Sequence, residues 1–302
     1  MNTVRTVLFS ALAVAPMAAF ALGGGGGGGS NPDPTPPGAA CDNNQLSPGT
    51  TSRTITVNGQ RREYILHVPR SYTGQNDVPL LLDFHGLSSG ADYQSRNSGT
   101  ADVANNEGFI VAYPQGIDNA WNIGPCCTES RGVDDVGFAR QLVDTISAQA
   151  CIDEKRVYAT GYSNGGGMSY KLACDAADKF AAVAPAAFDM IEELDCRPER
   201  PVSVFASRGQ RDFIVPFEGG RSTPPTHYRL DPIHFLGAEG SFERWGELNS
   251  CSGQPQSIGN SCESYNNCAA GTEVVLCTSR LGGHRAWDAQ QSWNFLKNHT
   301  LP

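Results

Sequence analysis

The chain has 302 residues, a formal net charge of −9, 39% hydrophobic residues and ten cysteines. The apolar content is sufficient for one large core, so we expect a single globular domain. The acidic charge balance argues against nucleic acid or an anionic membrane surface as a partner.

The first 40 residues differ in composition from the rest of the chain. Residues 1–21 contain one early basic residue, Arg5, then an apolar centre and a small-x-small end. This pattern is typical of a secretory signal peptide, with cleavage expected after Ala21. Residues 22–40 hold seven consecutive glycines and a Pro-rich stretch, which suits a flexible and then stiffer tether. The sequence predicts export to the periplasm or the exterior, no membrane association after signal cleavage, and a folded domain over 41–302.

The predicted elements of that domain alternate between strands and helices. Alternating apolar and polar residues on both sides of Asn58-Gly59 predict a β-hairpin. Short apolar runs that suit buried strands follow at 78–85, 108–114, 156–160, 180–187, 202–207 and 272–278. Helical segments are expected at 134–150, directly after Ser163, at 241–248 and at 287–297, whereas 88–98 is expected to be a loop. This order predicts an α/β domain with a doubly wound, mostly parallel sheet opened by an antiparallel hairpin.

A serine between glycines follows the strand at 156–160. In "GYSNGGG", Ser163 has the G-x-S-x-G spacing, in which Gly161 and Gly165 leave room for a strained turn between a strand and a helix. A second match, "GLSSG", centres on Ser88. The predicted strand before Ser163 and the helix start after it favour Ser163 over Ser88 as a nucleophile.

A serine hydroxyl needs a base to take its proton and a carboxylate to orient that base. His284, in "RLGGHRAWD", follows the last predicted strand on a glycine-rich loop. Asp212 follows the strand at 202–207, at the edge where parallel sheets place their functional residues. Asp189 and Asp195 follow the preceding strand and are the weaker alternatives. The sequence therefore predicts a catalytic set of Ser163, Asp212 and His284.

An anionic intermediate on such a serine needs two backbone N–H donors. Asn164, the residue after the serine, is one expected donor, and Leu87, in the loop after the strand at 78–85, is the other. His85 is then expected to be structural. Three aromatic residues either line a pocket for an acyl or sugar group or pack as large core residues: Tyr162, Trp121 and Trp287.

The cysteines of an exported chain indicate disulfides, and no C-x-x-C or H-E-x-x-H spacing supports a metal site. No cofactor is expected. The adjacent Cys126 and Cys127 are expected to bond to two different places. The other pairings considered are Cys174 with Cys196, Cys262 with Cys268, and Cys251 with Cys277.

Several segments together resemble a known family. "HG" at 85–86, "DDVGFARQLVD", "RVYATGYSNGGGMSYKLAC", "RGQRDFIVPFEGG" and "GGHRAW" are similar to the secreted polyhydroxybutyrate depolymerase and feruloyl esterase group of the α/β-hydrolases, carbohydrate esterase family one. The resemblance runs from about Ser52 to the C-terminus. It implies the α/β-hydrolase fold and a Ser, Asp, His order that maps onto the three residues above. The acid motif departs from the usual "HGTxD", since "RGQRD" stands there, and Arg285 rather than Trp follows the histidine.

These observations predict a secreted, monomeric serine ester hydrolase that acts through an acyl-enzyme. The expected partner is an oligomeric or polymeric ester, either a polyhydroxyalkanoate or other polyester, or feruloyl groups on plant polysaccharide. Two alternatives stay open: a serine peptidase on the same scaffold, and a non-catalytic binding protein that retains the fold.

Overall fold

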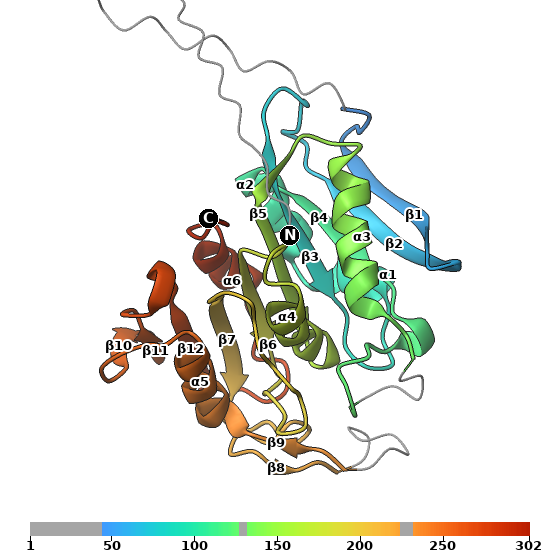
Figure 1. Ribbon diagram of the computed structural model, residues 1–302. Helices are drawn as coiled ribbons and strands as arrows, with labels where there is room; N and C mark the ends of the chain where they lie inside the picture. The colour runs from blue at the N-terminus through green and yellow to red at the C-terminus, as the bar shows by residue number, and fades with distance from the viewer. Residues whose placement is uncertain (1–43, 127–131, 224–231) are drawn as a thin grey trace, which may run out of the picture. The chain divides into compact units, whose positions relative to one another are not determined.

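A sheet of ten strands in the order β1-β2-β4-β3-β5-β6-β7-β12-β11-β10 forms the centre of the computed structural model (Figure 1). The structure describes residues 44–126, 132–223 and 232–302. The chain divides into the units Met1–Pro37 and Gly38–Pro302, and the fold described here is that of the second. The expected signal peptide and tether lie outside the described residues.

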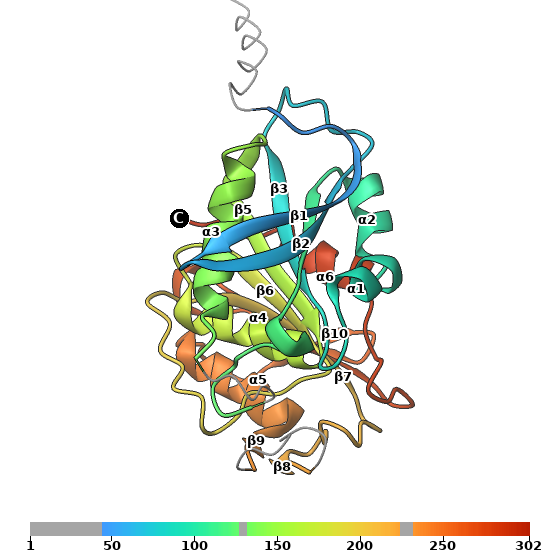
Figure 2. The same ribbon diagram turned by 90° about the vertical axis from the view of Figure 1, so that its right-hand side faces the viewer.

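The sheet begins with the predicted hairpin. Strand β1 (Gly49–Val57) pairs antiparallel with β2 (Gln60–Val68), and Val57 lies opposite Gln60. The two turn residues, Asn58 and Gly59, have positive φ angles of 50° and 79°. Two successive positive φ angles match the right-handed twist of paired strands, and Asn-Gly tolerates them best. Figure 2 shows α3 and the α1–α2 pair on opposite sides of this hairpin.

Six strands form the parallel centre of the sheet, and each overlaps a predicted apolar run. They are β3 (Val78–Phe84), β4 (Ile110–Pro114), β5 (Ile152–Tyr162), β6 (Ala182–Ala186), β7 (Ser203–Gly209) and β12 (Val274–Ser279). Both faces of these strands are covered: Leu80 and Leu82 belong to one core cluster and Leu81 to the other. Continuous apolar runs are expected for strands buried on both faces.

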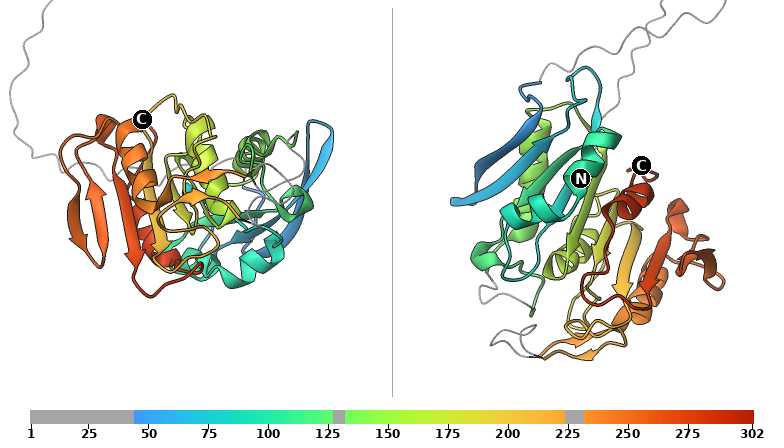
Figure 3. Two further views of the ribbon diagram at one scale, coloured as in Figure 1. Left: turned by 90° about the horizontal axis from the view of Figure 1, so that it is seen from below. Right: turned by 180° about the vertical axis from the view of Figure 1, so that it is seen from behind.

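Helices cover the two faces of the sheet. Helices α3 (Asp135–Ser147), α4 (Asn164–Asp175) and α5 (Gly237–Leu248) pack on one face, and α1 (Ala91–Asn97), α2 (Thr100–Glu107) and α6 (Ala289–Leu296) lie on the other (Figure 3). This arrangement confirms the predicted doubly wound α/β fold. No helix in the described ranges combines the length and apolar character needed to cross a bilayer.

The structure corrects the expectation of a loop over 88–98 and adds small elements. Helix α1 occupies most of that segment, and it buries Ala91 and Gln94 against the sheet. Its sequence lacks an apolar stripe, so helical periodicity could not reveal it. The elements η1 (Ile117–Asn119), β8 (Gly220–Arg221), β9 (His234–Phe235), β10 (Gln256–Gly259), β11 (Cys262–Tyr265) and η2 (Ala269–Gly271) complete the fold.

Two of the expected cysteine pairings are wrong. The structure pairs Cys262 with Cys277 and Cys251 with Cys268. The first pair follows from the sheet, because Cys262 on β11 lies directly opposite Cys277 on β12. The second joins the end of α5 to the segment after β11, where the Ala269 N–H donates to the Asn249 carbonyl at 2.8 Å.

One of the expected cysteine pairings is confirmed. Cys174 at the end of α4 bonds to Cys196, as predicted. Cys126 and Cys151 also form disulfides, while Cys127 lies outside the described residues. The described part of the chain contains no group of three or more His, Cys, Asp or Glu side chains that could hold a metal ion.

Candidate active site

Ser163 occupies a strained turn between β5 and α4. Its φ of 55° and ψ of −123° lie in a region that residues with a side chain seldom adopt. The turn is held on both sides, because the Ser163 N–H donates to the Ala186 carbonyl at 2.9 Å and the Ser163 carbonyl accepts from Gly167 N–H at 3.0 Å. These bonds fix the backbone from which the Ser163 hydroxyl projects, at the carboxyl edge of the sheet.

The neighbouring glycines let α4 approach the strands closely. A Cβ atom on Gly165 would lie 2.1 Å from the Phe84 carbonyl oxygen, and one on Gly161 would lie 2.4 Å from the Gly165 oxygen. A Cβ on Gly166 would lie 2.5 Å from the Ala186 oxygen. Any larger residue at these positions would push the helix away from the sheet, so the G-x-S-x-G pattern has a direct steric cause.

Three side chains that follow different strands are connected by hydrogen bonds: those of Ser163, His284 and Asp212. His284 Nε2 lies 2.9 Å from Ser163 Oγ, and His284 Nδ1 lies 2.7 Å from Asp212 Oδ2. The other oxygen of Asp212 accepts from the backbone N–H groups of Ile214 and Val215 at 2.9 and 3.0 Å. The carboxylate is thereby fixed by the backbone and directs one oxygen to the imidazole.

Asp212 is buried, with 4% of its surface exposed. Burial alone would raise the pKa of Asp212, but the hydrogen bond from His284 and the bonds from Val215 and Ile214 hold that pKa below its ordinary value. Because the carboxyl group stays ionised at neutral pH, it can orient His284 and balance a positive charge on the ring.

The two alternative carboxylates have other partners. Asp189 is buried and pairs with Arg208, and burial raises the pKa of Asp189 to about 7 although Arg208 lowers it. Asp195 is exposed and pairs with Arg197 at 2.8 Å. In the described residues, neither of the two hydrogen-bonds to His284. The geometry thus favours Asp212, as the sequence did.

The loops that carry Asp212 and His284 run side by side. The Gln210 N–H donates to the Ser279 carbonyl at 3.0 Å, and the Arg211 N–H donates to the Gly282 carbonyl at 2.9 Å. These backbone bonds extend the parallel pairing of β7 with β12 beyond the strand ends. The loops that carry the Asp212 carboxylate and the His284 imidazole are therefore held together by backbone hydrogen bonds.

The two expected oxyanion donors lie beside Ser163. A Cβ on Gly86 would lie 3.4 Å from the Ser163 Cβ, so the backbone entering Leu87 passes close to the serine. Leu87 and Asn164 both line the same cleft as Ser163. Neither of their N–H groups donates a backbone hydrogen bond within the described ranges. Their place beside Ser163 agrees with the expectation that they bind the oxyanion, which stays a prediction.

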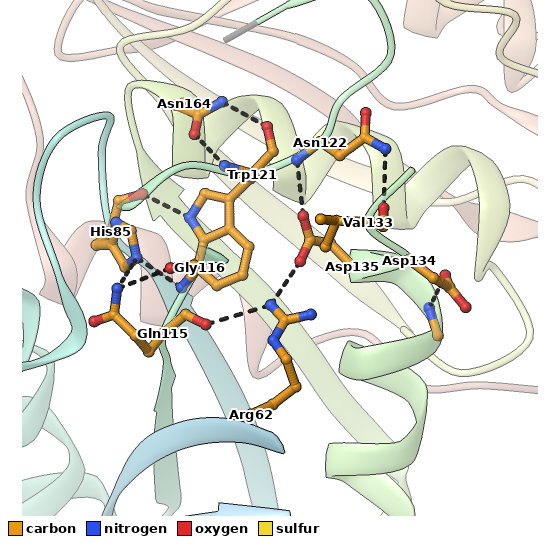
Figure 4. A network of polar contacts seen from close by, with 11 residues as sticks. Arg62, His85, Gln115, Gly116, Trp121, Asn122, Val133, Asp134, Asp135 and Asn164 are labelled. Atoms are coloured by element: carbon orange, nitrogen blue, oxygen red, sulfur yellow. Dashed lines mark hydrogen bonds and ion pairs between the residues drawn. The ribbon is translucent and has the colours of Figure 1, made fainter. Parts of the chain in front are cut away.

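The structure corrects the pocket assignment of Trp121. This residue is completely buried and does not line the cleft. Its indole Nε1 donates to the His85 carbonyl at 2.8 Å, and its backbone N–H donates to Asn164 Oδ1 at 2.7 Å (Figure 4). A large aromatic ring with a satisfied N–H group is suited to such an interior position. Trp121 is therefore a core residue and does not line the pocket.

His85 has the structural role expected for it. The Gly116 N–H donates to His85 Nε2 at 3.0 Å (Figure 4). The ring proton therefore resides on Nδ1, which donates to the Gly86 carbonyl at 2.8 Å. Burial lowers the pKa of His85 to about 4, which keeps the ring neutral at neutral pH. His85 thus fixes the start of the loop that carries Leu87.

A buried ion pair lies behind this network. Arg62 on β2 donates to Asp135 Oδ1 at 2.7 Å, and Asp135 Oδ2 accepts from the Asn122 N–H at 2.8 Å (Figure 4). Each of the two charged residues has 2% of its surface exposed. The sequence does not reveal this pair, because strand and helix patterns do not show which buried charges meet.

Ser163 opens into a cleft of about 760 Å³. An adjoining cavity of about 260 Å³ shares four of its lining residues: Tyr93, Gln94, Tyr162 and Arg285. Tyr162 thus lines both spaces, and Trp287 lines the smaller one. The sequence had not singled out Tyr93 or Gln94, because both belong to the segment that was expected to be a loop.

The fold and the hydrogen-bonded serine, histidine and aspartate define a member of the α/β-hydrolases. Residues 62–193 match the family model described as "Esterase PHB depolymerase". The chain is 41% identical over 251 residues to feruloyl esterase B of Piromyces equi, covering 80% of this chain and 46% of that protein. It is 33% identical over 252 residues to the putative esterase NocK of Nocardia uniformis subsp. tsuyamanensis, covering 78% and 73%.

Solved structures support the same fold. The acetyl xylan esterase from Aspergillus awamori superimposes with a TM-score of 0.59 at 14% identity, over 82% of this chain and 99% of that one. The chain belongs to the polyhydroxybutyrate depolymerase and feruloyl esterase group of the α/β-hydrolases, a group of carboxylic ester hydrolases. It spans just under half the length of the Piromyces protein.

Proposed function

We propose that this protein is a secreted carboxylic ester hydrolase that works through an acyl-enzyme. One observation carries the proposal: His284 bridges Ser163 Oγ and Asp212 Oδ2 with distances of 2.9 and 2.7 Å. In this arrangement Ser163 Oγ attacks the ester carbonyl while His284 Nε2 takes its proton. Asp212 holds the ring in the tautomer with a proton on Nδ1 and stabilises the imidazolium that forms.

The carbonyl oxygen becomes negatively charged when Ser163 adds to it. The N–H groups of Leu87 and Asn164 are the proposed donors for that oxygen, because both residues line the cleft beside Ser163. His284 then returns the proton to the leaving alcohol oxygen, which yields the acyl-enzyme. Water, activated by the same imidazole, attacks the acyl-enzyme and releases the acid.

A feruloyl ester is the better supported substrate. A relative with 41% identity over 80% of this chain is named as a feruloyl esterase. The smaller cavity has Tyr93, Tyr162 and Trp287 in its walls, which suit an aromatic ring. Gln94 donates its amide to Asp83 at 2.8 Å, so its carbonyl oxygen is left to accept a bond from a phenolic hydroxyl. Polyester remains the second candidate, because of the description of the matching family model.

Export is proposed on two grounds. The N-terminal residues have the composition of a signal peptide, and the described disulfides suit an oxidising compartment. A monomeric state is part of the same proposal. A non-catalytic binding protein on this fold would hydrolyse no ester, whereas a serine peptidase would cleave the matched amide as well as the ester, so the assay on methyl ferulate is run beside the corresponding ferulic acid amide.

The test compares product release from methyl ferulate and from 3-hydroxybutyrate oligomers. We expect faster release of ferulate, and Ser163→Ala should abolish hydrolysis of both. Ser88→Ala is the matched control, because Ser88 lines the same cleft and should leave much of the activity. A fluorophosphonate should label Ser163. Labelling of Ser88 instead, or activity that survives Ser163→Ala, would overturn the proposal.

The choice of substrate has its own test. Trp287→Ala opens the smaller cavity and should lower kcat/KM for methyl ferulate more than for p-nitrophenyl acetate, which has no ring in its acyl group. Equal losses on both esters would show that the aromatic walls do not bind the acyl group, while leaving the esterase assignment intact.

A further inference from the structure

Trp121 touches both segments that carry the proposed oxyanion donors. We propose that Trp121 is a positioning residue that fixes the Leu87 and Asn164 N–H groups relative to each other; this inference rests on the proposed serine esterase function. The two donors belong to segments far apart in the sequence, one after β3 and the other at the start of α4. Some contact must set the separation between them.

The first contact fixes the segment that leads to Leu87. The Trp121 indole Nε1 donates to the His85 carbonyl at 2.8 Å. The side chain of His85 is held as well, since its imidazole accepts from the Gly116 N–H at 3.0 Å and donates to the Gly86 carbonyl at 2.8 Å. Leu87 is two residues further along the chain. The position of the His85 carbonyl therefore constrains the position of the Leu87 N–H group.

The second contact fixes Asn164. The Trp121 N–H donates to Asn164 Oδ1 at 2.7 Å, and Asn164 Nδ2 donates to the Trp121 carbonyl at 3.2 Å. This pair of hydrogen bonds fixes the side chain of Asn164, and with it the residue whose backbone N–H is the second proposed donor. One tryptophan therefore connects to one segment through its indole and to the other through its backbone (Figure 4).

The position of Trp121 is itself rigid. Its ring packs edge-on against Phe84 with centroids 5.0 Å apart, and no part of the residue is exposed. The next residue, Asn122, donates its N–H to Asp135, which is paired with Arg62. This buried pair prevents the segment from moving independently of the sheet.

The consequence for catalysis is specific. Oxyanion donors must lie about 2.7 to 3.1 Å from the position of the developing charge, and they act in the transition state rather than on the bound ester. Loosening the separation between the two donors should therefore reduce kcat and leave KM nearly unchanged. A loss of packing alone would lower thermal stability without this kinetic pattern.

The first experiment compares Trp121→Phe with Trp245→Phe. Both tryptophans are fully buried, but the Trp245 Nε1 has no hydrogen-bond partner in the described residues, and Trp245 lies on α5 away from the cleft. We expect kcat of Trp121→Phe on methyl ferulate to fall about tenfold, since complete loss of one oxyanion donor lowers kcat about 100- to 1,000-fold. Trp245→Phe should retain the wild-type kcat.

The second variant is Asn164→Ala, which keeps the backbone N–H and removes both side-chain bonds to Trp121. It should show the same pattern of reduced kcat and unchanged KM, and it provides the test if Trp121→Phe does not fold. Affinity for a trifluoromethyl ketone, which forms a tetrahedral adduct with the serine, should fall by the same factor as kcat/KM in each variant. Affinity for the product ferulate should not change.

The outcomes separate this inference from the proposed function. If the wild-type protein neither hydrolyses esters nor reacts with a fluorophosphonate, the proposed function fails. If the wild-type is active but Trp121→Phe and Asn164→Ala keep the wild-type kcat and ketone affinity, or if Trp245→Phe loses as much kcat as Trp121→Phe, the positioning role is wrong.

Discussion

Replacing Asp212 by asparagine should trap His284 in an unproductive tautomer. In the wild-type protein Asp212 Oδ1 accepts two backbone N–H groups, from Ile214 at 2.9 Å and Val215 at 3.0 Å. The oxygen of an asparagine must keep these two bonds, because an NH₂ group there would face two donors. The NH₂ group would then point toward His284 Nδ1, which lies 2.7 Å from the other carboxylate oxygen.

This orientation determines the size of the effect. His284 Nδ1 would have to accept from the new NH₂ group, so the ring proton would move to Nε2, the atom that must take the proton of Ser163. A wrong tautomer of this kind lowers kcat about 10⁴-fold in serine hydrolases with this arrangement, or about 5.5 kcal/mol of transition-state stabilisation. KM should change far less, because Asp212 is buried beneath the imidazole and does not line the cleft.

The assay measures kcat and KM on methyl ferulate for Asp212→Asn, with thermal unfolding to confirm the fold. Asp195→Asn is the control, because this exposed carboxylate pairs with Arg197 and does not line the cleft. If folded Asp212→Asn kept kcat within tenfold of the wild-type value, the assignment of the acid would be wrong.

Three further predictions concern stability. Gly165→Ala should yield little soluble or active protein, since its Cβ would lie 2.1 Å from the Phe84 oxygen, and a normal yield would contradict the steric argument. Gly132→Ala is the control and should behave as wild-type, because no atom of the described residues lies within 4 Å of its Cβ position. Removing the Cys262–Cys277 disulfide by serine substitution at both positions should lower the free energy of unfolding by about 3 kcal/mol in a urea titration, because the bond closes a segment of 15 residues, and an unchanged midpoint would refute this. Burial raises the pKa of Asp83 to about 6, although bonds from Gln94 and Thr100 lower it. The folded state therefore binds the proton more tightly than the unfolded state. The free energy of unfolding of the wild-type relative to Asp83→Asn should fall by roughly 2 to 3 kcal/mol as pH rises from about 4 to above 6. A difference independent of pH would show that Asp83 ionises normally.

The strands of the parallel centre could be predicted because burial on both faces leaves a strong local signal. Leu80, Leu81 and Leu82 alternate between the two core clusters, so all three positions must be apolar. The positions of Ser163, Asp212 and His284 could be anticipated for a related reason: each follows a strand whose end is visible in the sequence.

The features that the sequence did not predict depend on contacts between distant segments. Helix α1 is held by the burial of Ala91 and Gln94 rather than by an apolar stripe. The pairing of Cys262 with Cys277 depends on the register of β11 and β12, which local patterns do not give. Trp121 is buried because the segments after β3 and β4 and the start of α4 meet around it.

The backbone bonds between the loops at Asp212 and His284 have a consequence for protein engineering. Because Gln210 and Arg211 donate to the carbonyls of Ser279 and Gly282, the two loops form one structural cassette although they are far apart in the sequence. A chimera that takes one loop from a related enzyme and keeps the other would combine two backbones that were not shaped for each other. Transplanting both loops together preserves the bonds, and with them the alignment of imidazole and carboxylate. Exchange of substrate specificity among relatives is therefore best attempted with this cassette moved as a unit or left untouched.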